Sequence, residues 1–182
     1  MGSLAEEMLA HWGKEKLQRA SPKLAESLRI PAASKAFLVE VGLPREEIGL
    51  ISYDLGPEAF PTLAEHARAR NANAPPGTAA FRLIGRGNIA PDFYLVDDEH
   101  GRIMEVDLEP QAIRFVNSRV EHLGAFLLAF VKSFVREEMS EEENKAYVHR
   151  MRADLLKIDP EALAESRHWW PQVLEQMEDG IL

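Results

Sequence analysis

The sequence of 182 residues contains no cysteine, which excludes disulfide bonds, thiolate nucleophiles and cysteine-ligated metal sites. It also lacks an apolar run of the roughly 20 residues needed to cross a bilayer. The longest such stretch, 123–135, is interrupted by Lys132 and Ser133. The first ten residues include Glu6 and Glu7 and do not show the basic-then-apolar pattern of a secretory signal. Together these absences predict a cytoplasmic protein that does not associate with membranes.

Basic residues are few relative to acidic ones. The chain has 21 Lys and Arg against 30 Asp and Glu, and its formal net charge is −9. A protein that binds a phosphate backbone needs a clustered basic surface to displace counterions, whereas the bases here are scattered among acids. The charge therefore argues against a nucleic-acid partner. It suits the steering of a basic partner, or it only keeps the protein soluble.

Motifs for catalysis and metal binding are also missing. The six histidines do not form the His-Glu-x-x-His spacing that places two metal ligands on one helix face. No Gly-x-Ser-x-Gly elbow is present to expose a nucleophilic serine. Residues 85–88 could form a phosphate-binding loop, but Pro91 and a strand follow instead of a helix, so we interpret this segment as a hairpin loop. The sequence predicts a protein that is not an enzyme and has no cofactor or metal.

The predicted elements run as helices, then strands, then helices. Ser3 and Glu6 form a capping-box pattern at the start of the first helix, and Ser21 followed by Pro22 can begin a second. A third helix over 34–41 is expected to stop at Gly42. Strands are expected at 48–53, 78–84, 93–97, 102–108 and 112–115, and one or two helical turns at 62–70 within the poorly patterned segment 55–76.

Further capping signatures begin the C-terminal helices, at Ser118 with Glu121 and at Ser140 with Glu143. Asp159 followed by Pro160 predicts a capped short helix after them. This order favours an α+β fold in which a central antiparallel meander is flanked by N-terminal and C-terminal helices. We expect a single domain over residues 1–182, in which residues 1–30 form an N-terminal helical extension of the main region 31–182.

The meander carries the most informative charges. Residues 92–109 contain seven acids and a single arginine, Arg102; the acids are Asp92, Asp97, Asp98, Glu99, Glu105, Asp107 and Glu109. Glu105 and Asp107 alternate with apolar neighbours, so the face of the strand that carries these two acids is predicted to be exposed to solvent or to a partner. Two interpretations stay open. Either this face binds a partner, or its acids pair across strands with Arg82 or Arg114, each pair being worth roughly 0–1 kcal/mol.

A tryptophan pair near the C-terminus supplies one further candidate contact. Trp169 and Trp170 point about 100° apart on a helix, so one is expected in the core and the other partly exposed. Tryptophan is enriched among binding hot spots. The residues selected as candidate partner contacts are Asp97, Asp98, Glu99, Glu105, Asp107 and Trp170.

Several stretches, in this order and spacing, resemble the SUKH superfamily and particularly its fourth family. They are residues 34–44 ending in Val-Gly-Leu-Pro, residues 93–97 followed by 101–103 and 106–107, residues 115–118 before an amphipathic helix, and the closing segment 169–180. The resemblance begins near Ile30. It implies a central antiparallel sheet flanked by helices, with no known catalytic activity.

Many members of that superfamily are immunity proteins that neutralise toxins, often nucleases or deaminases, by binding them. The resemblance therefore suggests a protein that binds a toxin domain with a basic active site through its acidic surface. The superfamily's toxin contacts vary, so no functional residue is carried over. Two alternatives stay open: a general intracellular interaction scaffold or regulatory module without a toxin partner, and an enzyme whose site is assembled from dispersed histidines and carboxylates.

Overall fold

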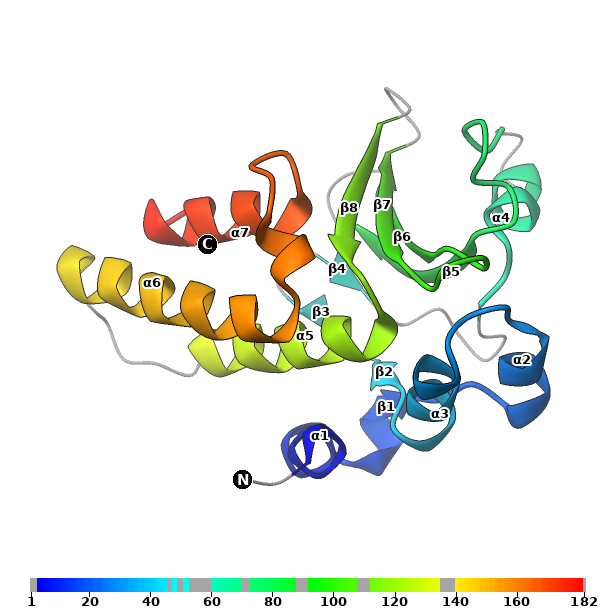
Figure 1. The fold of residues 1–182 in the computed structure, drawn as a ribbon, viewed down its shortest axis with the longest axis horizontal. Helices are drawn as coiled ribbons and strands as arrows, with labels where there is room; N and C mark the ends of the chain where they lie inside the picture. Colours follow the sequence, from blue (N-terminus) through cyan, green and yellow to red (C-terminus); the bar gives the residue numbers. More distant parts are fainter. Residues whose placement is uncertain are drawn as a thin grey trace.

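The computed structural model describes residues 3–45, 47–48, 51–52, 60–69, 73–87, 92–107, 112–134 and 140–181. Its helices and strands form three consecutive blocks (Figure 1). The first contains α1 (Leu4–Trp12), η1 (Lys14–Lys16), β1 (Leu17–Gln18), α2 (Pro22–Ser27), α3 (Ala32–Glu40) and β2 (Leu43–Pro44). The second contains β3 (Glu47–Ile48), β4 (Ile51–Ser52), α4 (Leu63–Ala69), β5 (Arg82–Gly87), β6 (Asp92–Val96), β7 (Ile103–Asp107) and β8 (Ile113–Asn117). The third contains α5 (Val120–Phe134), α6 (Glu141–Ile158), η2 (Pro160–Leu163) and α7 (Trp169–Glu178).

The N-terminal helices begin where their capping residues predict. The Ser3 hydroxyl accepts a hydrogen bond from the Glu6 amide, and the Glu6 carboxylate accepts one from the Ser3 amide, so the capping box is confirmed. The Ser21 hydroxyl accepts from the Leu24 amide, with Pro22 as the first helical residue of α2. The third helix starts at Ala32, two residues earlier than predicted, because Pro31 opens it.

The described strands form a two-stranded β1–β2 ribbon and an antiparallel sheet with the order β3-β4-β5-β6-β7-β8. Sequence neighbours are also sheet neighbours, so the predicted meander is confirmed. Two predictions are wrong: residues 78–81 are coil and turn, so that β5 begins at Arg82, and Gly85 to Gly87 are not a hairpin loop. Gly85 pairs with Tyr94 and Arg86 with Phe93, while Gly87 pairs with Ile51 of β4. The pairing is irregular between Leu83 and Gly85, and glycine within a strand often marks such an irregularity.

Both faces of the sheet are covered, which explains the uninterrupted apolar sequence of β6. Tyr94 and Val96 belong to the large core shared with the helices, whereas Phe93 and Leu95 pack in a smaller cluster with Leu63 of α4. The meander is therefore a central layer between two apolar clusters. The large core also contains Ile84, Ile103, Val116, Leu123, Phe126 and Leu127.

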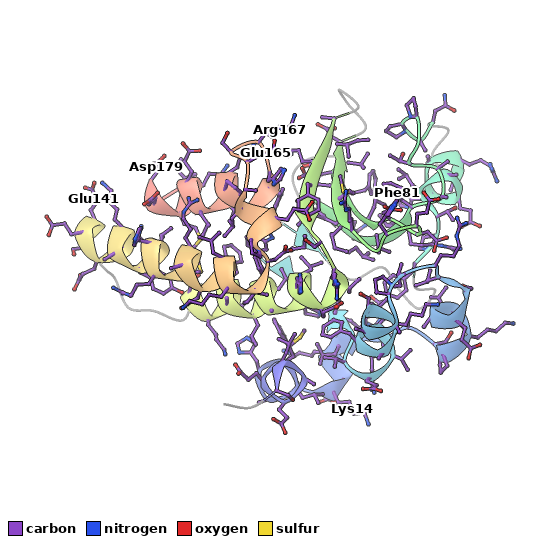
Figure 2. All side chains as sticks on the ribbon, in the orientation of Figure 1. Lys14, Phe81, Glu141, Glu165, Arg167 and Asp179 are labelled. Carbon is purple, nitrogen blue, oxygen red and sulfur yellow. The ribbon has the colours of Figure 1, made fainter. Side chains whose placement is uncertain are left out.

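The C-terminal helices lie together on one side of the sheet (Figure 1). Figure 2 shows Glu141, at the start of α6, and Asp179, just after α7, at the same end of this helical layer. The Asn144 side chain of α6 donates to the Met177 carbonyl of α7 at 2.6 Å, and this carbonyl also accepts from the Gly180 amide at 3.2 Å. The capping box of Ser140 and Glu143 forms as predicted.

The other two C-terminal capping predictions are wrong. Ser118 and Glu121 bind tertiary partners in place of a reciprocal cap: the Ser118 hydroxyl donates to Asp159, and the Glu121 carboxylate accepts from the Ser34 hydroxyl. Asp159 precedes η2 and does not cap it with its side chain. A buried carboxylate with several donors in reach gains more from them than from a single helix amide.

Gly42 provides a test of how tightly the β1–β2 ribbon is built. Its φ is +84°, and a Cβ atom there would lie 2.2 Å from the Gln18 carbonyl oxygen. Gly77 also has a positive φ, +82°, but its Cβ position is empty. We expect Gly77→Ala to lower the free energy of unfolding by about 1–2 kcal/mol, and Gly42→Ala to lower it by a further 1–3 kcal/mol, roughly, because the ribbon must shift. Urea denaturation checks both, and equal losses would contradict the close packing.

Candidate partner-binding surface

The turn between β6 and β7 holds three of the candidate acids, and the first of them is internal. The Asp97 carboxylate accepts a hydrogen bond from the Glu99 amide at 2.7 Å and lies 2.8 Å from Nδ1 of His100. The side chain is largely buried, at 13% exposure. Asp97 therefore shapes the turn and presents little surface to a partner.

The rest of the turn is attached to the N-terminal block. The Asp98 carboxylate accepts from the Arg29 amide at 3.1 Å. Gly101 packs so closely on Pro31 that a Cβ atom would lie 2.8 Å from the proline ring. On the other side Arg102 forms an ion pair with Glu161 at 3.7 Å. These contacts hold the turn in place and leave Glu99 as its exposed carboxylate.

Glu105 does not lie on a wet face, so that part of the sequence-based prediction is wrong. It is 2% exposed, and its carboxylate pairs with Arg114 of β8 and accepts from the Tyr94 hydroxyl at 3.0 Å. Burial raises the pKa of Glu105, and the Arg114 guanidinium opposes that rise. The cross-strand pairing with Arg114 was the alternative interpretation, and it is the one observed. The alternation of polar and apolar residues in β7 did not predict the exposure of Glu105 correctly, because helices also cover the face of the sheet on which Glu105 lies.

Asp107 lies at the opposite end of the hairpin from the turn. It is half-buried and directly faces Asp92 across the β6–β7 pair. Burial raises the pKa of Asp92, and the negative charge of Asp107 raises it further, because like charges placed opposite each other are unfavourable. A strand of this length separates this end from Glu99 by about 17 Å. The structure therefore divides the candidate acids into two surface regions and does not form one patch.

The selection of Trp170 as a partner contact is also wrong. It is completely buried, against Phe126 and Phe130, with ring-centroid distances of 5.0 and 6.0 Å. The half-buried member of the pair is Trp169, whose ring meets Tyr94 edge-on at 5.7 Å. The two tryptophans do point in different directions, as expected, but the buried one is the one that we selected as a contact.

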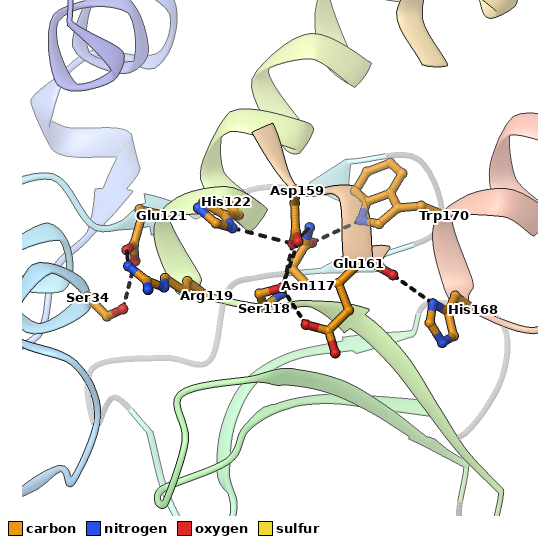
Figure 3. Close-up of polar contacts among 10 residues, drawn as sticks. All are labelled: Ser34, Asn117, Ser118, Arg119, Glu121, His122, Asp159, Glu161, His168 and Trp170. Atoms are coloured by element: carbon orange, nitrogen blue, oxygen red, sulfur yellow. Dashed lines mark hydrogen bonds and ion pairs between the residues drawn. The ribbon is translucent and has the colours of Figure 1, made fainter. Parts of the chain in front are cut away.

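A buried polar cluster is centred on Asp159 (Figure 3). Asp159 is 2% exposed. Its carboxylate accepts from the Ser118 hydroxyl at 2.6 Å, the Ser118 amide at 2.8 Å and the Asn117 side-chain amide at 3.1 Å. The Asn117 side-chain oxygen in turn accepts from the Trp170 indole at 2.9 Å. The cluster thus joins the end of β8, the start of η2 and α7.

His122 of α5 completes the cluster, with Nδ1 at 3.4 Å from the Asp159 carboxylate. Burial alone would raise the pKa of Asp159, but interactions with His122, Ser118 and Asn117 outweigh it and hold that pKa well below its usual range. The sequence could not reveal this cluster, because Asp159 also fits a helix cap and its donors lie some 40 residues away. The only local signal was an acid at the end of a helix.

Serine, histidine and aspartate meet here, but their order does not suit nucleophilic catalysis. A serine nucleophile needs its hydroxyl to donate to histidine, which the aspartate then orients. The Ser118 hydroxyl instead donates to Asp159 and, at 3.2 Å, to Glu161. Among the described residues, no group of three or more His, Asp or Glu side chains is arranged to hold a metal ion. The geometry instead suits a structural role, in which the Asp159 carboxylate connects β8, α5, η2 and α7. We call this cluster the joint.

Comparison with known proteins gives the family. The model of the SUKH-4 immunity protein family matches residues 4–176. The chain belongs to the SUKH-4 immunity protein family. The match includes the N-terminal helices and the motifs that suggested the resemblance, except the last four residues of the closing segment 169–180, and the α+β architecture agrees with it. Searches of curated proteins and of solved structures give no significant match. In the part of this SUKH-4 chain that the structure describes, no helix is both long and apolar enough to span a bilayer.

Substitution of Asp159 tests the joint. We expect Asp159→Asn to lower the free energy of unfolding by about 2–4 kcal/mol, because its amide group would face donors. Asp154→Asn, on the exposed side of α6, is the control and should cost less than about 0.5 kcal/mol. Since the pKa of Asp159 is depressed, the wild-type advantage should be complete above about pH 5 and shrink as the pH falls further. An advantage independent of pH would contradict the charged cluster.

Glu105 should show the opposite pH dependence. Its raised pKa means that folding favours the protonated carboxyl, so the stability of the wild type relative to Glu105→Gln should rise as the pH falls from neutral through that pKa. At pH 7 the substitution should lower the free energy of unfolding by about 1–3 kcal/mol, because it removes one partner of a mostly buried ion pair while the Arg114 guanidinium stays partly exposed to water. Arg114 also keeps Gln172 as an acceptor at 2.7 Å. Denaturant titrations at several pH values check both statements.

Proposed function

We propose that this SUKH-4 chain neutralises a toxin enzyme of the nuclease or deaminase type by binding it in the cytoplasm, without catalysis of its own. The observation that carries the proposal is the family match over residues 4–176. The net charge of −9 supports a partner with a basic active site, because enzymes that bind nucleic acid need basic grooves. An acidic inhibitor is attracted to such a groove and associates quickly.

The six candidate contacts take different roles in this proposal. Glu99 at the exposed turn and Asp107 at the far end of the hairpin are the acids that meet the toxin, with Asp98 beside Glu99. Asp97 and Glu105 support them from within: Asp97 holds the turn, and Glu105 positions Arg114. Trp170 supports the same surface as part of the core. The two acidic regions would contact separate basic areas of the toxin, about 17 Å apart.

Charge reversal at these acids tests the proposed contact. The partner to use is the toxin domain encoded beside the gene of this chain. We expect Glu99→Lys and Asp107→Lys each to lower the association rate constant about tenfold at low ionic strength, and the loss should shrink as salt is added. Stopped-flow mixing at several salt concentrations measures this effect.

The matched control is Glu26→Lys, on exposed α2, which changes the net charge equally. It should lower the rate about twofold or less, because only the total charge is altered. Equal losses in all three variants would show that the total charge matters and the hairpin acids do not. A wild-type chain that does not bind the toxin would instead support an interaction scaffold without a toxin partner.

A further inference from the structure

A groove of about 480 Å³ runs along α5, between α1 and the end of α6. Ala125, Leu128 and Ala129 of α5 line it, with Leu4 on one side and Ile158 on the other. Figure 1 shows α1 and α6 on opposite sides of α5. The two alanines leave room where larger residues would fill the space, and Ile158 is among the large apolar side chains that remain exposed, at 36%. The groove can therefore take a long side chain from another molecule.

The two ends of the groove differ in charge. At one end Lys132 forms an ion pair with Glu7 at 2.9 Å, which links α5 to α1 and leaves no net charge there. At the other end lie Glu121 and His122. His122 turns its Nδ1 towards the buried carboxylate of Asp159. This end therefore holds two carboxylates: Glu121, which is 18% exposed and has Arg119 at 3.9 Å, and Asp159 behind the imidazole.

Glu121 is held in position and still has capacity to bind. One oxygen accepts from the Ser34 hydroxyl at 2.7 Å, and the other lies 3.9 Å from the guanidinium of Arg119, which is half-exposed (Figure 3). A carboxylate offers about four acceptor positions. Neither neighbour saturates it, and the Arg119 contact is long enough to be exchanged at little cost.

We propose that this groove receives an arginine or lysine side chain of the toxin, and that Glu121 binds its charged head. This inference rests on the proposed function and names a specific contact within it. The apolar stem of a long basic residue would cover Ala125 and Ala129, as such stems do on apolar surfaces. The head would then meet Glu121, with Asp159 adding to the negative potential. An acidic side chain would be repelled by Glu121 and Asp159, and a purely apolar one would add no partner to the Glu121 carboxylate beyond Ser34 and Arg119.

The test measures the equilibrium dissociation constant for the toxin domain encoded beside the gene. We expect Glu121→Gln to raise that constant at least tenfold, because the ionic hydrogen bond to the head group is lost. Ala125→Trp should raise it to a similar extent by filling the groove. Two controls are matched to these variants: Glu142→Gln removes one negative charge from exposed α6, and Ala146→Trp adds the same bulk on that helix. Both controls should stay within about threefold of the wild type.

The partner's contribution is identified by changing each arginine and lysine of the toxin domain to alanine in turn. One of these changes should weaken binding to the wild-type chain and have little further effect on binding to Glu121→Gln. If the toxin binds but no basic residue couples to Glu121, or if Ala125→Trp binds as the wild type does, the groove contact is wrong and the proposed function stands. If the toxin does not bind the wild-type chain at all, both are wrong.

Discussion

The carboxylate of Asp159 lies where the last strand of the sheet, the long helix α5 and the C-terminal helices meet. It receives hydrogen bonds from Asn117 and Ser118 at the end of β8, and Asn117 also binds the indole of Trp170. A buried charge is costly unless donors surround it, so these contacts permit few other arrangements. The joint therefore fixes the helical layer on the sheet. It also fixes His122 at one end of the groove along α5.

The elements of this fold could largely be predicted because their signals are local. Ser3, Ser21 and Ser140 begin helices through contacts three residues away, and the alternation of strands and polar turns gives the meander. The predictions failed where a side chain's partner is distant in the sequence. Glu105 alternates with apolar neighbours as a surface acid would, yet helices cover both faces of the sheet. Ser118 and Asp159 match capping patterns, but each binds the other across about 40 residues of chain.

The same limit applies to the partner surface. The sequence motifs resembled the SUKH-4 family, and the family match confirms that prediction. The sequence left open whether the acidic charge serves a partner or only solubility. It could not indicate that the hairpin acids would separate into a turn region held by Arg29 and Pro31 and a strand end where Asp92 faces Asp107. Nor could it indicate the groove, which forms only when α1 and the end of α6 lie on either side of α5. The joint at Asp159 holds the two acidic regions and the groove in a fixed relation, so that one partner can contact all three.

The proposed role is that the chain inhibits a toxin enzyme by binding it. The most direct measurement is a titration of the toxin domain encoded beside its gene, following hydrolysis or deamination of a nucleic-acid substrate as the purified chain is added. We expect that activity falls linearly to the background at one equivalent of the chain and that the substrate itself is not bound by the chain. Activity that is unchanged at several equivalents, or inhibition that arises because the chain binds the substrate instead of the toxin, would contradict this expectation.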